Sequence, residues 1–157
     1  MPAGNGPICM SEETIDAIFR KYRTVSIVGL SKDQSKDSYK VAKFLMDRGF
    51  TVVPVNPTAN EILGLKAYPS ISHLPDEMKS RLDIVDIFRP SADVPSIVDE
   101  ALEMRKKFGR PHVIWMQLGI QDENAAARAR SQGIAVIMNR CMMIEGASRK
   151  DMLSFRL

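Results

Sequence analysis

Apolar positions along the chain follow two periods, and segments of the two kinds alternate. Short, largely β-branched runs with few polar residues are typical of strands that helices cover on both faces. Longer segments in which apolar residues recur every three or four positions are typical of amphipathic helices. The predicted strands are 25–30, 50–55, 82–88, 112–116 and 134–138, with a further short strand near 66–68. The predicted helices are 11–22, 39–48, 91–108 and 122–133.

Signals at the helix ends support these assignments. The helix that starts near Ser91 has three basic residues in its last turn and Gly109 just beyond, which suits the negative end of the helix dipole and a left-handed stop. Asp122 stands where it can cap the following alanine-rich helix. Beyond Cys141 the apolar residues show no clear period, so a loosely packed tail is predicted there.

Strands that alternate with helices of this length imply right-handed crossovers and a mainly parallel sheet with helices on both faces. The chain is therefore predicted to be a three-layer α/β fold. Its expected division is an N-terminal segment and helix over 1–23, the main domain over 24–145 and a tail over 146–157.

Composition narrows the class of protein. At 157 residues, with 45% hydrophobic and 26% charged residues, the chain fits one globular domain. The net charge of +3 is small and scattered, so a nucleic-acid groove is not indicated. Cys9 and Cys141 lie far apart and neither belongs to a C-x-x-C pair, which argues against a zinc site or a disulfide framework. With no long apolar run and no signal peptide visible, a cytoplasmic protein without membrane contact is expected.

The loop after the first predicted strand has the outline of a phosphate-binding turn. The apolar run reaches Gly29, and the residues from there to Ser38 include three serines and two lysines before the next helix begins. Unpaired N–H groups and the positive end of the dipole favour an anion at such a helix start. The turn is not a complete dinucleotide-binding motif, because Ser31 and Gln34 occupy the second and third glycine positions of G-x-G-x-x-G.

The end of the second strand argues against NAD. NAD-binding turns place an Asp or Glu there to bind the adenosine ribose hydroxyls, whereas this chain has Pro54, Val55, Asn56 and Pro57. A nucleotide with a phosphorylated ribose tolerates the absence of that negative charge.

Polar and conformationally special residues follow every strand of the predicted sheet, and ligands bind at this edge of parallel sheets. Arg89 offers planar donors for a phosphate, although a surface ion pair is an alternative. Turns favour Gly, Pro, Asn and Ser for backbone reasons alone, so single positions carry little weight. The strand-end segments are 29–31, 56–57, 88–90, 117–119 and 139–141.

Taken together with Ser38-Tyr39, Gly64 and Tyr68-Pro69-Ser70, these segments resemble the small stand-alone CoA-binding domain proteins. They are also similar to the CoA-binding module of succinyl-CoA synthetase α subunits. The resemblance covers roughly 24–145. It implies a Rossmann-like fold that binds coenzyme A, in a family whose members mostly lack an established catalytic activity.

The resemblance also implies roles for individual residues. Gly29, Ser31 and the loop to Ser38 would cradle the pyrophosphate, with Lys36 supplying a charge that suits phosphate. Asn56 and Pro57 would border the adenosine. Gln117 and Gly119 would face the pantetheine path, and residues 88–90 would line the cleft beside the first strand. The full set implied for CoA is Gly29, Leu30, Ser31, Lys36, Ser38, Tyr39, Val55, Asn56, Pro57, Phe88, Arg89, Pro90, Gln117, Gly119, Asn139 and Arg140. Leu30 and Asn139 depart from the family, which usually has Ala and Asp at these positions.

Neither a catalytic set nor a metal site is predicted. His73 and His112 have no motif partner and are expected to be structural or solvent-exposed rather than catalytic. Cys141 is interpreted as a small buried hydrophobe, with thiol exchange with CoA as the alternative.

Three functions remain open from the sequence. The first is a CoA or acyl-CoA binding protein that is not catalytic alone. The second is a detached subunit of a CoA ligase that needs a partner subunit, and the third is an NAD(P)-binding redox protein. A homodimer through the helix over 15–22 and the methionine-containing tail is also left open.

Overall fold

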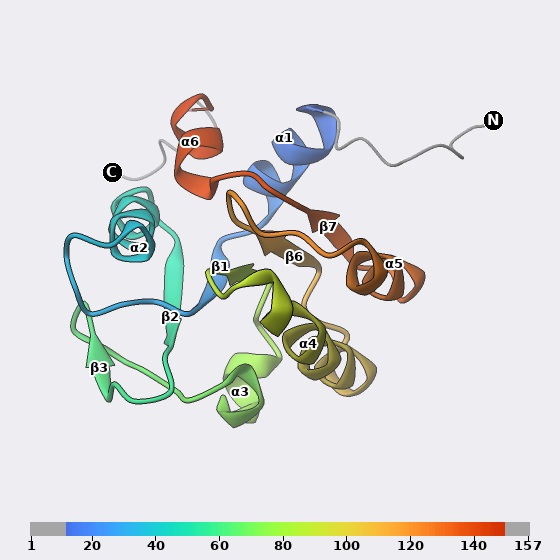
Figure 1. Cartoon of the computed structure of the whole chain (residues 1–157), viewed down its shortest axis with the longest axis horizontal. Coiled ribbons are helices and arrows are strands. Elements are labelled where there is room, and N and C mark those ends of the chain that lie inside the picture. Colours follow the sequence, from blue (N-terminus) through green and yellow to red (C-terminus); the bar gives the residue numbers. More distant parts are fainter. Residues whose placement is uncertain (1–11, 150–157) are drawn as a thin grey trace.

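A sheet of five parallel strands lies at the centre of the molecule, in the order β2-β1-β5-β6-β7 (Figure 1). The computed structural model describes residues 12–149. The helices, with η marking short 3-10 turns, are α1 (Glu12–Lys21), α2 (Asp37–Asp47), η1 (Ile71–His73), α3 (Asp76–Lys79), η2 (Ser91–Asp93), α4 (Val94–Phe108), α5 (Glu123–Ser131) and α6 (Met142–Ala147). The strands are β1 (Thr24–Val28), β2 (Thr51–Val55), β3 (Glu61–Ile62), β4 (Leu65–Lys66), β5 (Ile84–Ile87), β6 (Val113–Met116) and β7 (Ala135–Ile137).

Helices cover both faces of the sheet, as the sequence predicted. Alternate side chains of each strand enter two separate apolar clusters. On one face α4 and α5 pack with η1 against the strands. On the other face lie α1, α2 and α6, where the fully buried Trp115 packs edge-on to Phe19 with 5.8 Å between the ring centres. The fold is a Rossmann-like three-layer α/β domain.

The strand order reverses at β1, which lies between β2 and β5. Val28 at the end of β1 is in register with Val55 on one side and with Ile87 on the other. Beyond β2 a single parallel bridge joins Val55 to Tyr68, whose N–H donates to the Pro54 carbonyl over 3.1 Å. If Tyr68 is counted as a remnant third strand, the order becomes the 3-2-1-4-5-6 of dinucleotide-binding domains.

The five longer predicted strands and the four predicted helices occur within the described residues, with ends shifted by a few residues. The cap at Asp122 is confirmed, since its carboxylate accepts from the Ala125 N–H over 2.9 Å. Around 66–68 the structure differs, because β4 pairs antiparallel with β3 in a small hairpin and only Tyr68 bridges to the main sheet. The sequence also gave no sign of η1 and α3, which are too short to show a period.

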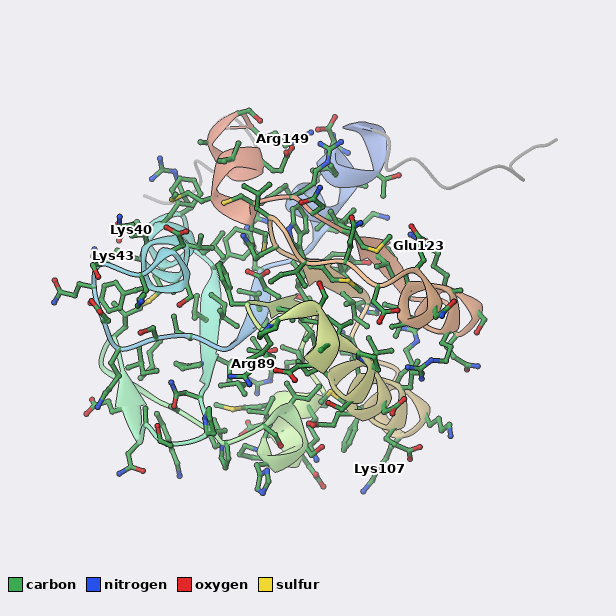
Figure 2. All side chains as sticks on the ribbon, in the orientation of Figure 1. Lys40, Lys43, Arg89, Lys107, Glu123 and Arg149 are labelled. Atoms are coloured by element: carbon green, nitrogen blue, oxygen red, sulfur yellow. The ribbon has the colours of Figure 1, made fainter. Side chains whose placement is uncertain are left out.

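The tail predicted after Cys141 is wrong in its first part, where the chain forms α6. Met142 is fully buried, and Arg149 joins α6 to α1 (Figure 2). The Arg149 guanidinium lies 2.6 Å from the Asp16 carboxylate and 2.9 Å from that of Glu145. A six-residue helix has little stability of its own and depends on such tertiary contacts. Ser11 and Cys9, together with the tail from 150 onward, lie outside the described residues.

The helix expected as a dimer surface is used within the chain. Ile15, Ile18 and Phe19 of α1 are buried in the protein's own core. The face of α1 that carries these side chains is therefore not available to a second copy. None of the helices in the described part is long and apolar enough to cross a membrane.

One acidic side chain lies in the middle of this core. Asp86 of β5 is fully buried, in register with Ile27 and Trp115, and neither carboxylate oxygen has a hydrogen-bond partner among the described residues. Burial raises the pKa of the Asp86 carboxyl well above its ordinary value. The folded protein therefore favours the protonated form of Asp86.

Protonation of Asp86 should make folding stability depend on pH. The folded pKa of Asp86 is raised, so the protonated carboxyl contributes fully to folding stability below the unfolded pKa of about 3.9. This stability is lost as pH rises through the folded pKa. The amide of Asp86→Asn cannot ionise. As pH rises from the unfolded to the folded pKa, we expect the free energy of unfolding of Asp86→Asn to increase relative to that of the wild type. The increase is at most about 1.4 kcal/mol per pH unit.

Urea denaturation of both proteins from pH 4 to pH 9 measures this gain. The acid end of the series is the internal reference, because the folded Asp86 carboxyl is uncharged there, like the amide, and the expected gain is smallest. Parallel curves for the two proteins would contradict a neutral Asp86.

Candidate functional site

The turn at the end of β1 brings three strand ends together at Gly29. The Gly29 N–H donates to the Val55 carbonyl of β2 over 2.9 Å, and its φ is 93°. A Cβ at this position would lie 2.9 Å from the Phe88 carbonyl oxygen and 3.1 Å from Cδ of Arg89. Only glycine satisfies both the conformation and this close approach to the chain that follows β5.

The loop from Ser31 to Ser38 is held by its own side chains, and we term it the phosphate loop after the role that the sequence predicts for it. The Ser31 N–H donates to the Ser38 hydroxyl over 3.0 Å, and the Asp33 N–H donates to the Ser31 hydroxyl over 3.0 Å. The Asp33 carboxylate accepts from both the N–H and the hydroxyl of Ser35. These two hydrogen bonds, with Lys36 nearby, lower the pKa of the Asp33 carboxyl.

The phosphate loop leads into α2. Lys36 is the N-cap residue of α2, and its side chain makes no capping hydrogen bond. The first N–H groups of a helix have no partner within the helix, and the dipole is positive there. Together with the exposed ammonium of Lys36, this end of α2 suits an anion.

Asn56 fixes the turn from the side of β2. Its side-chain amide donates to the Leu30 carbonyl over 2.8 Å. Its carbonyl oxygen accepts from the N–H groups of Thr58 and Ala59 over 2.8 Å and 2.9 Å. The amide is thus committed to the protein's own loops, which gives Asn56 a positioning role beside the nucleotide contact expected of it.

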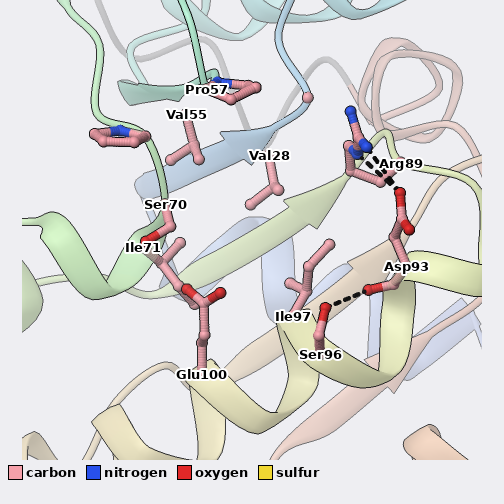
Figure 3. A pocket seen from close by; sticks show the side chains of 12 residues that line it. Val28, Val55, Pro57, Ser70, Ile71, Arg89, Asp93, Ser96, Ile97 and Glu100 are labelled. Atoms are coloured by element: carbon pink, nitrogen blue, oxygen red, sulfur yellow. Dashed lines mark hydrogen bonds and ion pairs between the residues drawn. The ribbon is translucent and has the colours of Figure 1, made fainter.

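Arg89 is held at the edge of the site by an acidic neighbour. Its Nε and one terminal nitrogen lie 3.1 Å and 2.8 Å from the same oxygen of Asp93, and both side chains are partly exposed (Figure 3). The sequence left a phosphate contact and a surface ion pair as alternatives for Arg89. The structure contains the ion pair with Asp93, and Arg89 also lines a cavity.

Three neighbouring cavities run along the carboxyl ends of the strands. The switch-point cavity, of about 280 Å³, lies between the ends of β1 and β2 and the start of α4 (Figure 3). The loop cavity, of about 250 Å³, contains Ser31, Lys36 and Ser38. The α2–α6 cavity, of about 260 Å³, is bounded by those two helices and by Gln117 and Leu118. Gly29 lines the first two cavities, and Asp37 and Phe88 line the last two, so the three are contiguous.

Most of the residues predicted for CoA are brought together here. Those that line one of the three cavities are Gly29, Ser31, Lys36, Ser38, Val55, Pro57, Phe88, Arg89 and Gln117. Tyr39 instead borders a separate hollow on α2 with Lys40 and Lys43. Those that line none of the three are Tyr39, Leu30, Asn56, Pro90, Gly119, Asn139 and Arg140.

Several of the non-lining residues hold the rim in place. Leu30 is fully buried in the core. The Asn139 side chain accepts from the Gly119 N–H over 2.7 Å, and Asn139 itself has a φ of 59°. The Arg140 carbonyl accepts from the indole N–H of Trp115 over 2.8 Å, which satisfies the donor of that buried ring.

Several residues that line the switch-point cavity and the α2–α6 cavity were not identified from the sequence. Ser96, Ile97 and Glu100 from α4 line the switch-point cavity. Leu118 and Ile144 line the α2–α6 cavity. A usable signal existed for α4, because the first turns of a helix that follows a parallel strand lie at the same edge as the strand's end. No such signal existed for Ile144, since α6 itself was not predicted.

The two histidines lie outside this groove of cavities. His112 precedes β6 at the opposite edge of the sheet, where it stacks on Tyr22, and burial lowers its pKa with help from Arg110. His73 hydrogen-bonds the Ser70 hydroxyl over 2.7 Å. No group of three or more potential metal-ligating side chains occurs among residues 12–149. Cys141 is half-buried and lines the α2–α6 cavity.

Comparisons with known proteins agree with this architecture. A family model described as a CoA binding domain matches residues 23–147. The uncharacterized protein YneT of Bacillus subtilis is 34% identical over 140 residues, which cover 89% of this chain and 97% of that protein. The solved structure of a hypothetical protein from Pyrococcus horikoshii OT3 superposes with a TM-score of 0.80 at 30% identity, covering 94% of this chain and 98% of that one.

A larger enzyme contains a similar segment. The ADP-forming acetate-CoA ligase II of Archaeoglobus fulgidus is 35% identical over 83 residues. These residues amount to 52% of this chain and only 12% of the ligase.

Substitution of Gly29 tests the constraint at the centre of the site. We expect Gly29→Ala to lower the free energy of unfolding by about 2–4 kcal/mol, from a left-handed alanine and the displacement of the Phe88 carbonyl. Gly109→Ala is the matched control, because Gly109 also has a positive φ but nothing within 4 Å of the added Cβ. Chemical denaturation measures both losses. Equal losses would show that the close approach to Phe88 is no constraint.

Proposed function

Since the chain belongs to the CoA binding domain family, we propose that it binds coenzyme A, free or as an acyl thioester, along the contiguous cavities at the carboxyl edge of its sheet. The observation that carries this location is the sharing of Gly29, Asp37 and Phe88 between neighbouring cavities. CoA is a long ligand with a base at one end, phosphates near the middle and a thiol at the other. A groove with an anion-binding loop in its middle fits that order.

The adenosine end is assigned to the switch-point cavity. Val55, Pro57, Ile71 and Ile97 give this cavity apolar walls that suit a flat base. No carboxylate stands at the end of β2 to bind the ribose hydroxyls, because residues 56–57 are Asn and Pro. A ribose that carries a phosphate therefore meets no carboxylate from the end of β2. The acidic residues of this cavity, Asp93 and Glu100, lie on the side of α4, where Asp93 is paired with Arg89.

The pyrophosphate is assigned to the loop cavity. Ser31, Ser38 and Lys36 lie at the start of α2, where backbone N–H groups and the helix dipole favour negative charge. Arg89 lines the neighbouring cavity and supplies a second cation. Asp93 holds that guanidinium ready for a phosphate, and the phosphate would compete with Asp93 for it.

The pantetheine arm is assigned a path past Phe88 toward Gln117. Phe88 lines both the loop cavity and the α2–α6 cavity and so forms the wall between them. Gln117 is buried and offers an amide to the amides of the arm, while its carbonyl oxygen accepts from the Met142 N–H over 3.1 Å. Gly119 is exposed and lines neither cavity, so its contribution is the turn that positions Gln117.

The protein is proposed to bind rather than to catalyse on its own. Neither histidine lines one of the three cavities. The Ser70 hydroxyl, which lines the switch-point cavity, hydrogen-bonds to His73 over 2.7 Å, and we assign this contact to the local turn at η1. The similarity to one part of an acetate-CoA ligase supports a second candidate, a subunit that completes a ligase with a partner chain. Isolation of the native protein as a lone species would count against this second candidate.

Ligand titration tests the proposed function. In isothermal calorimetry we expect CoA to bind at least about tenfold more tightly than NAD, a difference of about 1.4 kcal/mol, with dephospho-CoA between them. The reason is the missing carboxylate at the end of β2. Absence of CoA binding, or equal binding of CoA and NAD, would overturn the proposal.

Substitution of Arg89 tests the location of the phosphates. We expect Arg89→Met to weaken CoA binding about tenfold through loss of charge-assisted hydrogen bonds. Asp93→Asn releases the guanidinium from its ion pair and should keep or improve the affinity. Arg81→Met is the matched control, because Arg81 also pairs with an acidic residue four positions away, Glu77, but lines none of the three cavities. Equal affinity for Arg89→Met and Arg81→Met would place the phosphates elsewhere.

A further inference from the structure

Two large apolar side chains are strongly exposed in the described part of the chain, and both belong to the α2–α6 cavity. Leu118 is 64% exposed and Ile144 is 59% exposed. They come from different elements, the turn after β6 and helix α6, and converge on the same hollow. Single exposed apolar residues need no explanation, but two that meet at one cavity indicate an apolar ligand.

The other residues that line this cavity are also mostly apolar. Val41, Phe88, Cys141 and Met143 complete its apolar lining. Its polar side chains are Asp37 and Gln117, and the carbonyl oxygen of Gln117 already accepts from the Met142 N–H. No lysine or arginine is among the residues that line it.

The cavity is reached from the phosphate loop. Asp37 and Phe88 line both the loop cavity and the α2–α6 cavity, so the two hollows adjoin at these residues. An arm that leaves an anion at the loop and passes these side chains reaches the apolar hollow. A suitable ligand is anionic in its middle and apolar at the end of this arm. Free CoA ends in a thiol and leaves Leu118 and Ile144 in water, whereas a thioester can cover them.

We infer that the α2–α6 cavity receives the apolar acyl group of a CoA thioester, so that the preferred ligand is an acyl-CoA with an uncharged aliphatic chain. This inference rests on the proposed function, and it adds a substrate class to it. Acyl groups that end in a carboxylate are disfavoured, because the cavity offers Asp37 and no cation to them.

A series of thioesters measures the preference by calorimetry. From acetyl-CoA through butyryl-CoA to hexanoyl-CoA we expect the affinity to rise about two- to fourfold per methylene, the upper value corresponding to full burial of a CH₂. Succinyl-CoA has the same chain length as butyryl-CoA but carries a carboxylate, and it should bind at least about tenfold more weakly than butyryl-CoA.

Substitution of the two exposed side chains tests where the acyl group binds. The double variant Leu118→Ser/Ile144→Ser should lose the gain with chain length and keep its affinity for free CoA. Both side chains are exposed, so the thermal midpoint should stay close to wild type. Leu102→Ser is the matched control, since Leu102 is half-buried on α4 and lines none of the three cavities.

Alkylation of Cys141 gives an independent readout of position. In a Cys9→Ser background Cys141 is the remaining thiol of the chain. Its reaction with N-ethylmaleimide, at thioester concentrations that give equal occupancy, should slow further as the acyl chain lengthens.

The outcomes separate the two proposals. Failure of every ligand to bind, CoA included, overturns the proposed function. Binding of CoA with no dependence on chain length overturns the acyl site alone, and then favours a protein surface over Leu118 and Ile144. The acyl site is also overturned if affinity still rises with chain length in the double variant. It is overturned as well if longer acyl chains leave the alkylation rate of Cys141 unchanged. Tighter binding of succinyl-CoA than of butyryl-CoA contradicts the predicted substrate class.

Discussion

The close approach of Gly29 to the backbone after β5 is the constraint on which the site depends. A hydrogen bond to Val55 fixes the turn on one side, and the Phe88 carbonyl fills the space that a Cβ would need on the other. Because the strand order reverses at β1, this single residue contacts both halves of the sheet. The switch-point cavity and the loop cavity open on either side of it, and both include Gly29 in their walls.

The polar residues at this edge divide into two groups with different tasks. Asn56 and Asn139 have their side chains committed to backbone groups of neighbouring loops, at 2.8 Å and 2.7 Å. Lys36 and Arg89 carry charge into the cavities, and Arg89 is retained by Asp93. A rim built in this way is ordered before a ligand arrives, which reduces the entropy lost on binding. The phosphate loop is ordered in the same sense by Ser38 and Asp33.

The groove also changes character along its length. Hydroxyl and charged side chains make up most of the loop cavity, and the switch-point cavity combines apolar walls with the Arg89–Asp93 ion pair. Apolar side chains dominate between α2 and α6. That gradient matches a ligand with a nucleotide at one end and an aliphatic group at the other. Neither histidine lines these cavities, which supports the proposal that the groove binds a ligand.

The sequence by itself determined the layers and the central turn. Strands such as 84–87 are continuously apolar apart from Asp86, and α4 has a clear helical period, so local composition sufficed. Short elements depend on contacts that are remote in sequence. Helix α6 is held by Arg149 and Asp16, which are 133 positions apart, and no local pattern encodes that pairing. For the same reason only the tertiary structure decided that Asn56 supports a loop and that Leu118 and Ile144 meet at one cavity. Periodicity reports which face of an element is buried, whereas a cavity is defined by where several elements meet.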